Sequence, residues 1–454
     1  RVGKNPLTGA LVPAVLIGFY APNSGNVTNG MVTAPESAYD NGFNPGTGVR
    51  LGPRFGFAYD PSGDGKTAIR GSASIGRNPL NSNGRYSNYV SGSPPVQFNP
   101  QLYYGSLTTY LGSTGELSPP GTVSSYDPNL KTTTLYSWSF SVQRDLGSSI
   151  LANVAYVGNA GRYVQQQQNI NQLPYGIRFL PSSVDPATPA VPLPDNFLRP
   201  YRGYGNILYF VNRGISNYNA LQISANRRFT RGYQFGVGYT WSKAMDDGTT
   251  ATTYLSNQMR NYGMTGNDRT HVLTVNFTYG VPKLSAVAPH PIVRQVFDGW
   301  LLSGIVAVAS GAPQGFSFST VTGADLTGGG DGQRVNLTGP VVLERGQRGF
   351  TRWFATENVA LPGKGDIGNA AVNSFRGPGT NNWDLTVFKD FPVKEAAKFQ
   401  LRWEAYNVFN HTQWSSVNSA ARFDAQGRQV NTLFGTVTAA RGPRVMQGSL
   451  RFEF

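Results

Sequence analysis

The chain closes on the stretch Val445-Met-Gln-Gly-Ser-Leu-Arg-Phe-Glu-Phe454, in which apolar and polar side chains alternate from Met446 onward. One parity holds Met446, Gly448, Leu450, Phe452 and Phe454, and the other holds Gln447, Ser449, Arg451 and Glu453. Successive side chains of a β-strand point to opposite faces. The stretch therefore predicts a strand with one apolar face and one polar face, which ends on an aromatic residue.

The same period of two recurs along the chain and predicts ten further strands. They are Arg54–Tyr59, Thr67–Ile75, Thr134–Arg144, Ile150–Val157, Asn219–Phe229, Tyr233–Lys243, Thr270–Tyr279, Trp300–Ser310, Trp383–Phe391 and Lys398–Phe409. Most have about 9–11 residues, the length that a tilted strand needs to cross a bilayer. We expect antiparallel all-β structure with about 12–16 strands and no helix longer than two or three turns.

The connections between these strands alternate in length. They are short or moderate after Tyr59, Arg144, Phe229, Tyr279 and Phe391, and long after Ile75, Val157, Lys243, Ser310 and Phe409. Short turns at one end and long loops at the other are typical of a transmembrane β-barrel, with the short turns in the periplasm. The sequence thus predicts a partial antiparallel transmembrane β-barrel with long extracellular loops.

Composition agrees with a barrel and excludes several other classes. Of the 454 residues 39% are hydrophobic and 14% are charged, and Gly (55), Tyr (23) and Phe (26) are plentiful. No apolar run reaches the roughly 18 residues of a membrane helix. The absence of Cys excludes disulfides and thiolate metal sites. The net charge of +14 comes from scattered basic residues, which favours anionic lipid head groups or acidic ligands over nucleic acid.

The alternation also predicts which side chains face lipid and which face a wet lumen. Charged groups in a small dry barrel would be costly to bury, whereas a wide barrel solvates them. We expect the lumen to be lined by Gln400, Arg402 and Glu404, together with Gln222, Asn226 and Thr274. The residues expected to face lipid are Leu221, Ile223, Phe235, Val237, Leu273, Val275, Leu401 and Trp403.

No set of residues predicts catalysis or a resident metal. His271, His290 and His411 are far apart and lack metal-ligand spacing. Asp325 and Asp331 are candidate calcium ligands in a glycine-rich loop, but this loop lacks the regular Asp spacing and the closing Glu of an EF-hand loop. Asp246-Asp247 is a similar weak candidate. We therefore expect no enzyme activity, no cofactor and no metal site.

Several motifs resemble one known family. They are Gly52–Pro61 with Gly63–Thr67, Ser141–Arg144, Val154–Gly158, Ser216–Gln222, Tyr239–Ala244, Asp268–His271, Arg376–Asp384 and Glu404–His411. Together they resemble the barrel of TonB-dependent receptor-like outer-membrane proteins of the Oar-like group. The resemblance implies an upstream signal peptide, often a carboxypeptidase-regulatory-like β-sandwich, and a plug domain. It assigns residues 51–454 to the C-terminal part of the barrel and residues 1–50 to a segment like an extracellular loop.

The resemblance also implies a function and its partners. Extracellular loops would capture an unknown ligand, and the lumen would pass it when an inner-membrane energy-coupling protein remodels the plug, which is missing from this chain. Outer-membrane barrels end on a strand that their assembly machinery reads, which implies an assembly signal at Leu450, Phe452 and Phe454. The expected location is the outer membrane of a Gram-negative-type bacterium, in contact with its lipid.

Two alternatives remain open at this point. One is a surface structural or adhesion protein of the outer membrane that carries out no active transport. The other is a soluble β enzyme. The closing strand is expected either to leave the sheet open or to pair with the earliest available strand, near Arg54–Tyr59.

Overall fold

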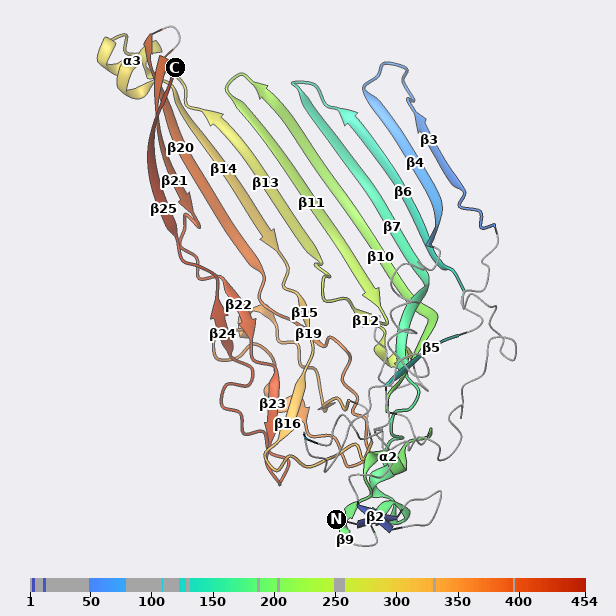
Figure 1. Cartoon of the computed structure of the whole chain (residues 1–454). Helices are drawn as coiled ribbons and strands as arrows, with labels where there is room; N and C mark the ends of the chain where they lie inside the picture. Colours follow the sequence, from blue (N-terminus) through green and yellow to red (C-terminus); the bar gives the residue numbers. More distant parts are fainter. Residues whose placement is uncertain are drawn as a thin grey trace.

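The computed structural model describes residues 2–4, 11–13, 49–78, 108, 122–127, 131–185, 188–201, 205–248, 258–329, 332–394 and 397–454. One large curved sheet dominates it (Figure 1). Its main strands are β3 (Arg54–Tyr59), β4 (Thr67–Asn78), β6 (Thr133–Asp145), β7 (Ile150–Asn169), β10 (Ile207–Thr230), β11 (Tyr233–Asp246), β13 (His271–Gly280), β14 (Trp300–Ala309), β20 (Thr380–Lys394), β21 (Ala397–Tyr406) and β25 (Val445–Glu453).

These eleven strands follow one another in the order β25-β21-β20-β14-β13-β11-β10-β7-β6-β4-β3. Every pairing on this path is antiparallel. β12 (Gly263–Met264) pairs with β11, and β5 (Val123–Tyr126) pairs in parallel with β10, which completes a 13-stranded sheet. The predicted all-β antiparallel fold is confirmed, and each of the eleven predicted strands is present. The short parallel pairing of β5 was not predicted.

Two strands are much longer than their sequence pattern predicted. β7 has 20 residues and β10 has 24, and they stay paired from Ile150 opposite Arg227 to Asn169 opposite Leu208. The register shifts near Gly214. Backbone pairing continues past the alternating part because hydrogen bonds between strands do not require an apolar face. The sheet therefore extends well into the region of the long loops.

The two ends of the sheet differ as the sequence predicted. Short connections and the C-terminus lie at one end (top in Figure 1), and the long connections lie at the other. The short-turn end also carries a small helical element between β13 and β14, formed by η7 (Leu284–Ala286) and α3 (Pro291–Phe297). No helix in the described ranges has the length and apolarity needed to cross a membrane.

The remaining elements are short and belong mostly to the long connections. They are β1 (Val2–Lys4), β2 (Leu11–Pro13), η4 (Ile177–Phe179), η5 (Pro181–Ser183), β8 (Val184–Asp185), β9 (Thr188–Pro192), α2 (Asp195–Leu198), η6 (Gln258–Asn261), β15 (Pro313–Gln314), β16 (Ser317–Thr320), β17 (Asn336–Leu337), η8 (Arg345–Gln347), η9 (Thr356–Asn358), β18 (Val359–Ala360), β19 (Phe375–Arg376), β22 (Trp414–Val417), β23 (Ala420–Phe423) and β24 (Val437–Ala440). Most of segment 1–50 lies outside the described residues.

The hydrophobic core cluster lies in the long loops, although single sheet residues such as Ala220 and Val306 are also buried. Phe354 and Phe423 are almost fully buried in a cluster formed by the β14–β20 and β21–β25 connections. Their rings meet other aromatic rings, for example Phe316 against Phe354 at 5.0 Å between centroids. None of the eight residues predicted to face lipid is buried, and none belongs to this cluster. The two loops thus form a folded body of their own at the long-loop end.

Candidate functional site

A network of polar side chains crosses one face of β20, β21 and β25. Gln400 lies opposite Asp390 and donates its Nε2 to the Asp390 Oδ1 at 2.9 Å. Lys398 bridges two carboxylates, with its Nζ 2.9 Å from the Asp390 Oδ2 and 3.1 Å from the Glu453 Oε2. Each of these charges therefore has a partner on a neighbouring strand.

The network continues along the same face toward the loops. The Arg402 Nε lies 2.8 Å from the Glu404 Oε1, and the Gln447 side chain donates a hydrogen bond to the same carboxylate. The Tyr406 hydroxyl also donates to Glu404, at 3.3 Å. Gln400, Arg402 and Glu404 thus belong to one charged, partly exposed surface. Their assignment to a lumen stays a prediction.

The opposite face of the same strands is apolar and exposed. Leu401 pairs with Leu450 across the β21–β25 ladder, and the ring centroids of Phe399 and Phe452 lie 4.8 Å apart. Phe454 is 97% exposed and stacks on Phe452 at 5.9 Å. Such a row of exposed large apolar groups is expected where lipid covers the surface.

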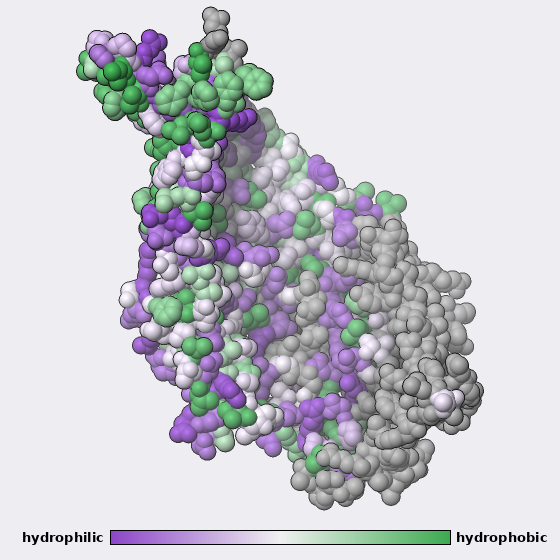
Figure 2. Space-filling model, turned by 60° about the vertical axis from the view of Figure 1, so that its left-hand side comes forward, coloured by the Kyte–Doolittle hydropathy of each residue, from purple (hydrophilic) through white to green (hydrophobic). Residues whose placement is uncertain are grey.

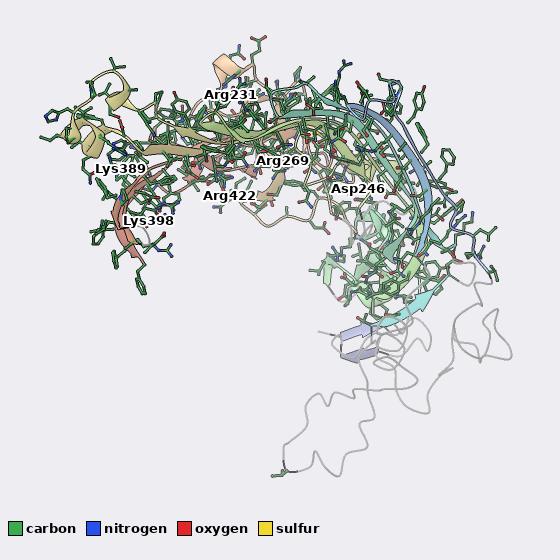
Figure 3. All side chains as sticks on the ribbon, turned by 90° about the horizontal axis from the view of Figure 1, so that it is seen from above. Arg231, Asp246, Arg269, Lys389, Lys398 and Arg422 are labelled. Atoms are coloured by element: carbon green, nitrogen blue, oxygen red, sulfur yellow. The ribbon has the colours of Figure 1, made fainter. Side chains whose placement is uncertain are left out.

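Lys389 shows which side of the sheet is the apolar one. It lies on the apolar face, directly opposite Leu401, yet it is buried, and its Nζ donates to the backbone carbonyls of Gln295 and Asp298, both at 2.6 Å. Figure 3 shows the sheet as an arc, with α3 beyond its convex side near Lys389. The apolar face is therefore the convex one. The polar network lies on the concave side.

The small helical element beside Lys389 is itself apolar on its surface. Ile292, Val296 and Phe297 of α3 are exposed, and the Trp300 indole donates to the Val296 carbonyl at 2.9 Å. Figure 2 shows hydrophobic side chains gathered at this short-turn end. Sequence reasoning missed Lys389, because an ammonium at an apolar position runs against the alternation that defined the faces.

The motifs that resemble a known family meet where the strands enter the long loops. The Asp268 side chain is completely buried and pairs with the Arg376 guanidinium. The same carboxylate accepts from the Ala244 backbone N–H at 2.5 Å. Arg376 also donates to the Gly311 carbonyl at 3.1 Å. Three sequence segments are therefore tied together by one carboxylate and one guanidinium.

A second group of motif residues forms an aromatic belt beside this ion pair. The Tyr239 hydroxyl lies 2.8 Å from the His271 Nδ1. Trp383 meets Phe409 at 5.6 Å, and Phe409 stacks on His411 at 5.5 Å between ring centroids. Sequence reasoning did not predict these contacts, because the partners lie far apart in the chain. The resemblance of these motifs to a known family was the only signal in the sequence.

The possible calcium ligands serve as structural hydrogen-bond acceptors. The Asp325 Oδ2 accepts from Arg178 at 2.7 Å, and its Oδ1 accepts from the Gly328 N–H at 2.9 Å. Burial raises the pKa of Asp325, but the hydrogen bonds from Arg178, Gly328 and Thr327 outweigh it and hold this pKa below its ordinary value. Asp331 lies outside the described residues.

The other candidates have similar roles. Asp246 accepts from the Gly248 N–H at 3.0 Å, and Asp247 accepts from the Ile215 N–H at 2.9 Å. His290 caps α3 by accepting from the Ile292 N–H at 3.2 Å. Among the residues whose structure is described, no group of three or more His, Asp or Glu side chains is placed to hold a metal ion.

Comparisons with solved structures give matches of low similarity. They include the outer membrane transporter YddB from Escherichia coli (TM-score 0.39, 11% identity, 88% of this chain and 41% of that one). They also include the FrpB iron transporter, F5-1 variant, from Neisseria meningitidis (TM-score 0.39, 14% identity, 89% of this chain and 39% of that one). The siderophore receptor PiuA from Acinetobacter baumannii is a third (TM-score 0.39, 11% identity, 88% of this chain and 35% of that one). This chain spans less than half the length of each of these proteins. A search among curated proteins gives no match.

The comparison with protein families is decisive. The family described as "Outer membrane beta barrel domain" matches residues 13–447, nearly the whole chain. The antiparallel sheet with an exposed apolar convex face is the structure that such a family requires. The chain therefore belongs to the outer membrane β-barrel domain family, and its place is the bacterial outer membrane.

Proposed function

We propose that this chain is the barrel part of a TonB-dependent receptor-like transporter, with extracellular loops that capture a ligand and a lumen that passes it. The observation that carries the proposal is the charged network on the concave side, where Asp390, Lys398, Arg402 and Glu404 face away from the exposed apolar surface. A wet lumen is the environment in which such a row is solvated. The motifs gathered at the loop rim add support through their resemblance to this family.

The proposed uptake route uses fixed polar groups in place of water around a polar solute. Gln400, Arg402 and Glu404 offer both donors and acceptors along the strand direction, so a solute exchanges partners stepwise. The plug domain and the inner-membrane protein that remodels it are partners of the whole transporter. The loop body built on Phe354 and Phe423 supplies a folded surface at the entrance.

The proposed assembly route uses the last strand. Leu450, Phe452 and Phe454 present a continuous apolar row on the convex side, which the barrel assembly machinery would read before the strand meets outer-membrane lipid. We propose that this barrel acts without catalysis, without a cofactor and without a nucleic-acid partner.

Cells of the source organism with and without the gene test the proposal. We expect a solute to be depleted from a complex medium only by cells that carry the protein, and only while the inner membrane is energised. Untargeted mass spectrometry of the medium, with and without a protonophore, measures this.

The folded loop body also favours a second candidate, an adhesion protein. Loss of attachment without any solute difference would support adhesion and reject transport.

A variant links uptake to the polar network. Arg402→Gln removes the ion-pair partner of Glu404 and should lower uptake several-fold while the amount of protein in the outer membrane is unchanged. Arg231→Gln, at the exposed β10–β11 turn, removes the same charge elsewhere and serves as control. Equal uptake by both variants would contradict a role for the network in transport.

A further inference from the structure

A large groove opens on the apolar side of the sheet, next to the aromatic belt. Its volume is about 1090 Å³, and its lining includes Leu273 and Val308 from the sheet, Arg345, Arg348 and Trp353 from the β14–β20 loop, and Trp414. Leu273 and Val308 are direct partners in the β13–β14 ladder. One wall of the groove is therefore the sheet itself, and the other is the loop body.

The position of the groove places it at the boundary between lipid and water. Leu273 lies on the same face as Val275 and Phe277, which the strand pairing joins to the rest of the convex apolar surface. The groove lies at the end of β13 and β14 where the long loops begin. It is thus continuous with the surface that lipid covers in the outer membrane.

The chemistry of the groove is basic and aromatic. None of the described residues that line it is acidic. Arg376 is already paired with Asp268, whereas Arg345 and Arg348 take part in no ion pair among the described side chains. Trp353 meets Trp414 edge to face at 5.8 Å.

The loop that supplies both arginines also exposes apolar groups. Val342 is 55% exposed and Phe350 is 59% exposed, and the Phe350 ring lies 6.5 Å from that of Trp414. Aromatic side chains with basic neighbours are typical of the interface between a bilayer and water. The loop therefore has the apolar groups to enter the head-group region and the cations to bind anions there.

We propose that this groove binds the phosphate-bearing head group of a glycolipid in the outer leaflet. Arg345 and Arg348 would contact the phosphate, for which the planar guanidinium is well suited. The acyl chains would lie along the exposed apolar face below, beside Leu273 and Val275. The inference rests on the proposed orientation, with the long loops outside, and is independent of transport.

The test measures lipid binding by the full-length protein in detergent. The probes are diphosphoryl lipid A and its dephosphorylated form, titrated by native mass spectrometry. We expect Arg345→Gln/Arg348→Gln to weaken binding of the phosphorylated lipid at least about tenfold. Binding of the dephosphorylated form should change little. Arg231→Gln/Arg422→Gln removes the same charge from exposed positions outside the groove and should leave both affinities as they are.

Three results would overturn the assignment. Equal affinity of both double variants for diphosphoryl lipid A would show that the groove arginines do not bind it. Equal binding of the two lipid forms by the unaltered protein would remove the role of phosphate. Displacement of the lipid by an equal concentration of inorganic phosphate would assign the groove to a free anion. Protease access to the β14–β20 loop on intact cells tests the orientation separately.

Discussion

At the scale of single residues, Asp268 is the clearest case of a side chain whose surroundings determine its role. Its carboxylate has 0% exposure and holds Arg376 and the Ala244 N–H at the point where three segments meet. A buried carboxylate is costly unless it is paired and hydrogen-bonded. The pair therefore fixes the base of the β14–β20 loop to the sheet.

Arg376→Met should loosen this loop, because it leaves the Asp268 carboxylate buried without its charged partner. We expect local opening to become easier by about 2 kcal/mol, less than for a fully buried pair because the Arg376 side chain is 24% exposed. Limited proteolysis within residues 311–379 should accelerate about tenfold or more. Arg352→Met, which breaks an exposed pair with Glu357 in the same loop, is the control and should change cleavage little. Similar cleavage of both variants would refute the role of the buried pair.

At the scale of elements, the sequence predicted the strands well and their lengths less well. Period-2 alternation located β3 at the same bounds as the structure, Arg54–Tyr59. It missed the outer parts of β7 and β10, where runs such as Gln165–Gln168 carry no apolar parity. Alternation of apolar and polar residues identifies a strand that has one apolar face. A paired strand segment outside the bilayer needs no apolar face, so its sequence lacks this alternation.

The closing strand yields the prediction at this scale. Phe454→Asp should lower the amount of inserted protein more than it lowers binding by the protein that is inserted, because the apolar end of β25 is the proposed assembly signal. Outer-membrane yield and heat-modifiable gel mobility measure insertion. Leu433→Asp, at an exposed loop position, is the matched control. Unchanged insertion of the Phe454 variant would show that this end is not the signal.

At the scale of the whole molecule, the sheet has two free edges. Within the described part of the chain, β25 pairs only with β21 and β3 only with β4, so the open alternative for the closing strand holds. The edge strands β25 and β3 lie at opposite sides of the sheet in Figure 1. The loop body could not be predicted, because its core residues are scattered over two connections with no period. The groove escaped prediction for the same reason.

Cross-linking checks this arrangement, and the absence of Cys in the chain leaves no background. Leu401→Cys/Leu450→Cys joins direct partners of the β21–β25 ladder and should cross-link efficiently in the membrane. Phe57→Cys/Leu450→Cys places the thiols on the two edge strands and should not cross-link within one chain. Efficient linkage of the second pair would show that β3 and β25 close on each other.

The contact between Lys389 and α3 has a consequence for how deeply the protein sits in the bilayer. The Lys389 ammonium lies on the convex apolar face, where the carbonyls of Gln295 and Asp298 accept its hydrogen bonds and the Trp300 and Phe391 rings lie 5.5 and 4.9 Å from it. Were α3 to leave, the ammonium would lose these acceptors and face hydrocarbon, which costs several kcal/mol. The helix is therefore held against the sheet at a fixed height. Its exposed Ile292 and Phe297 then mark the level at which the hydrocarbon layer ends on the side of the short turns.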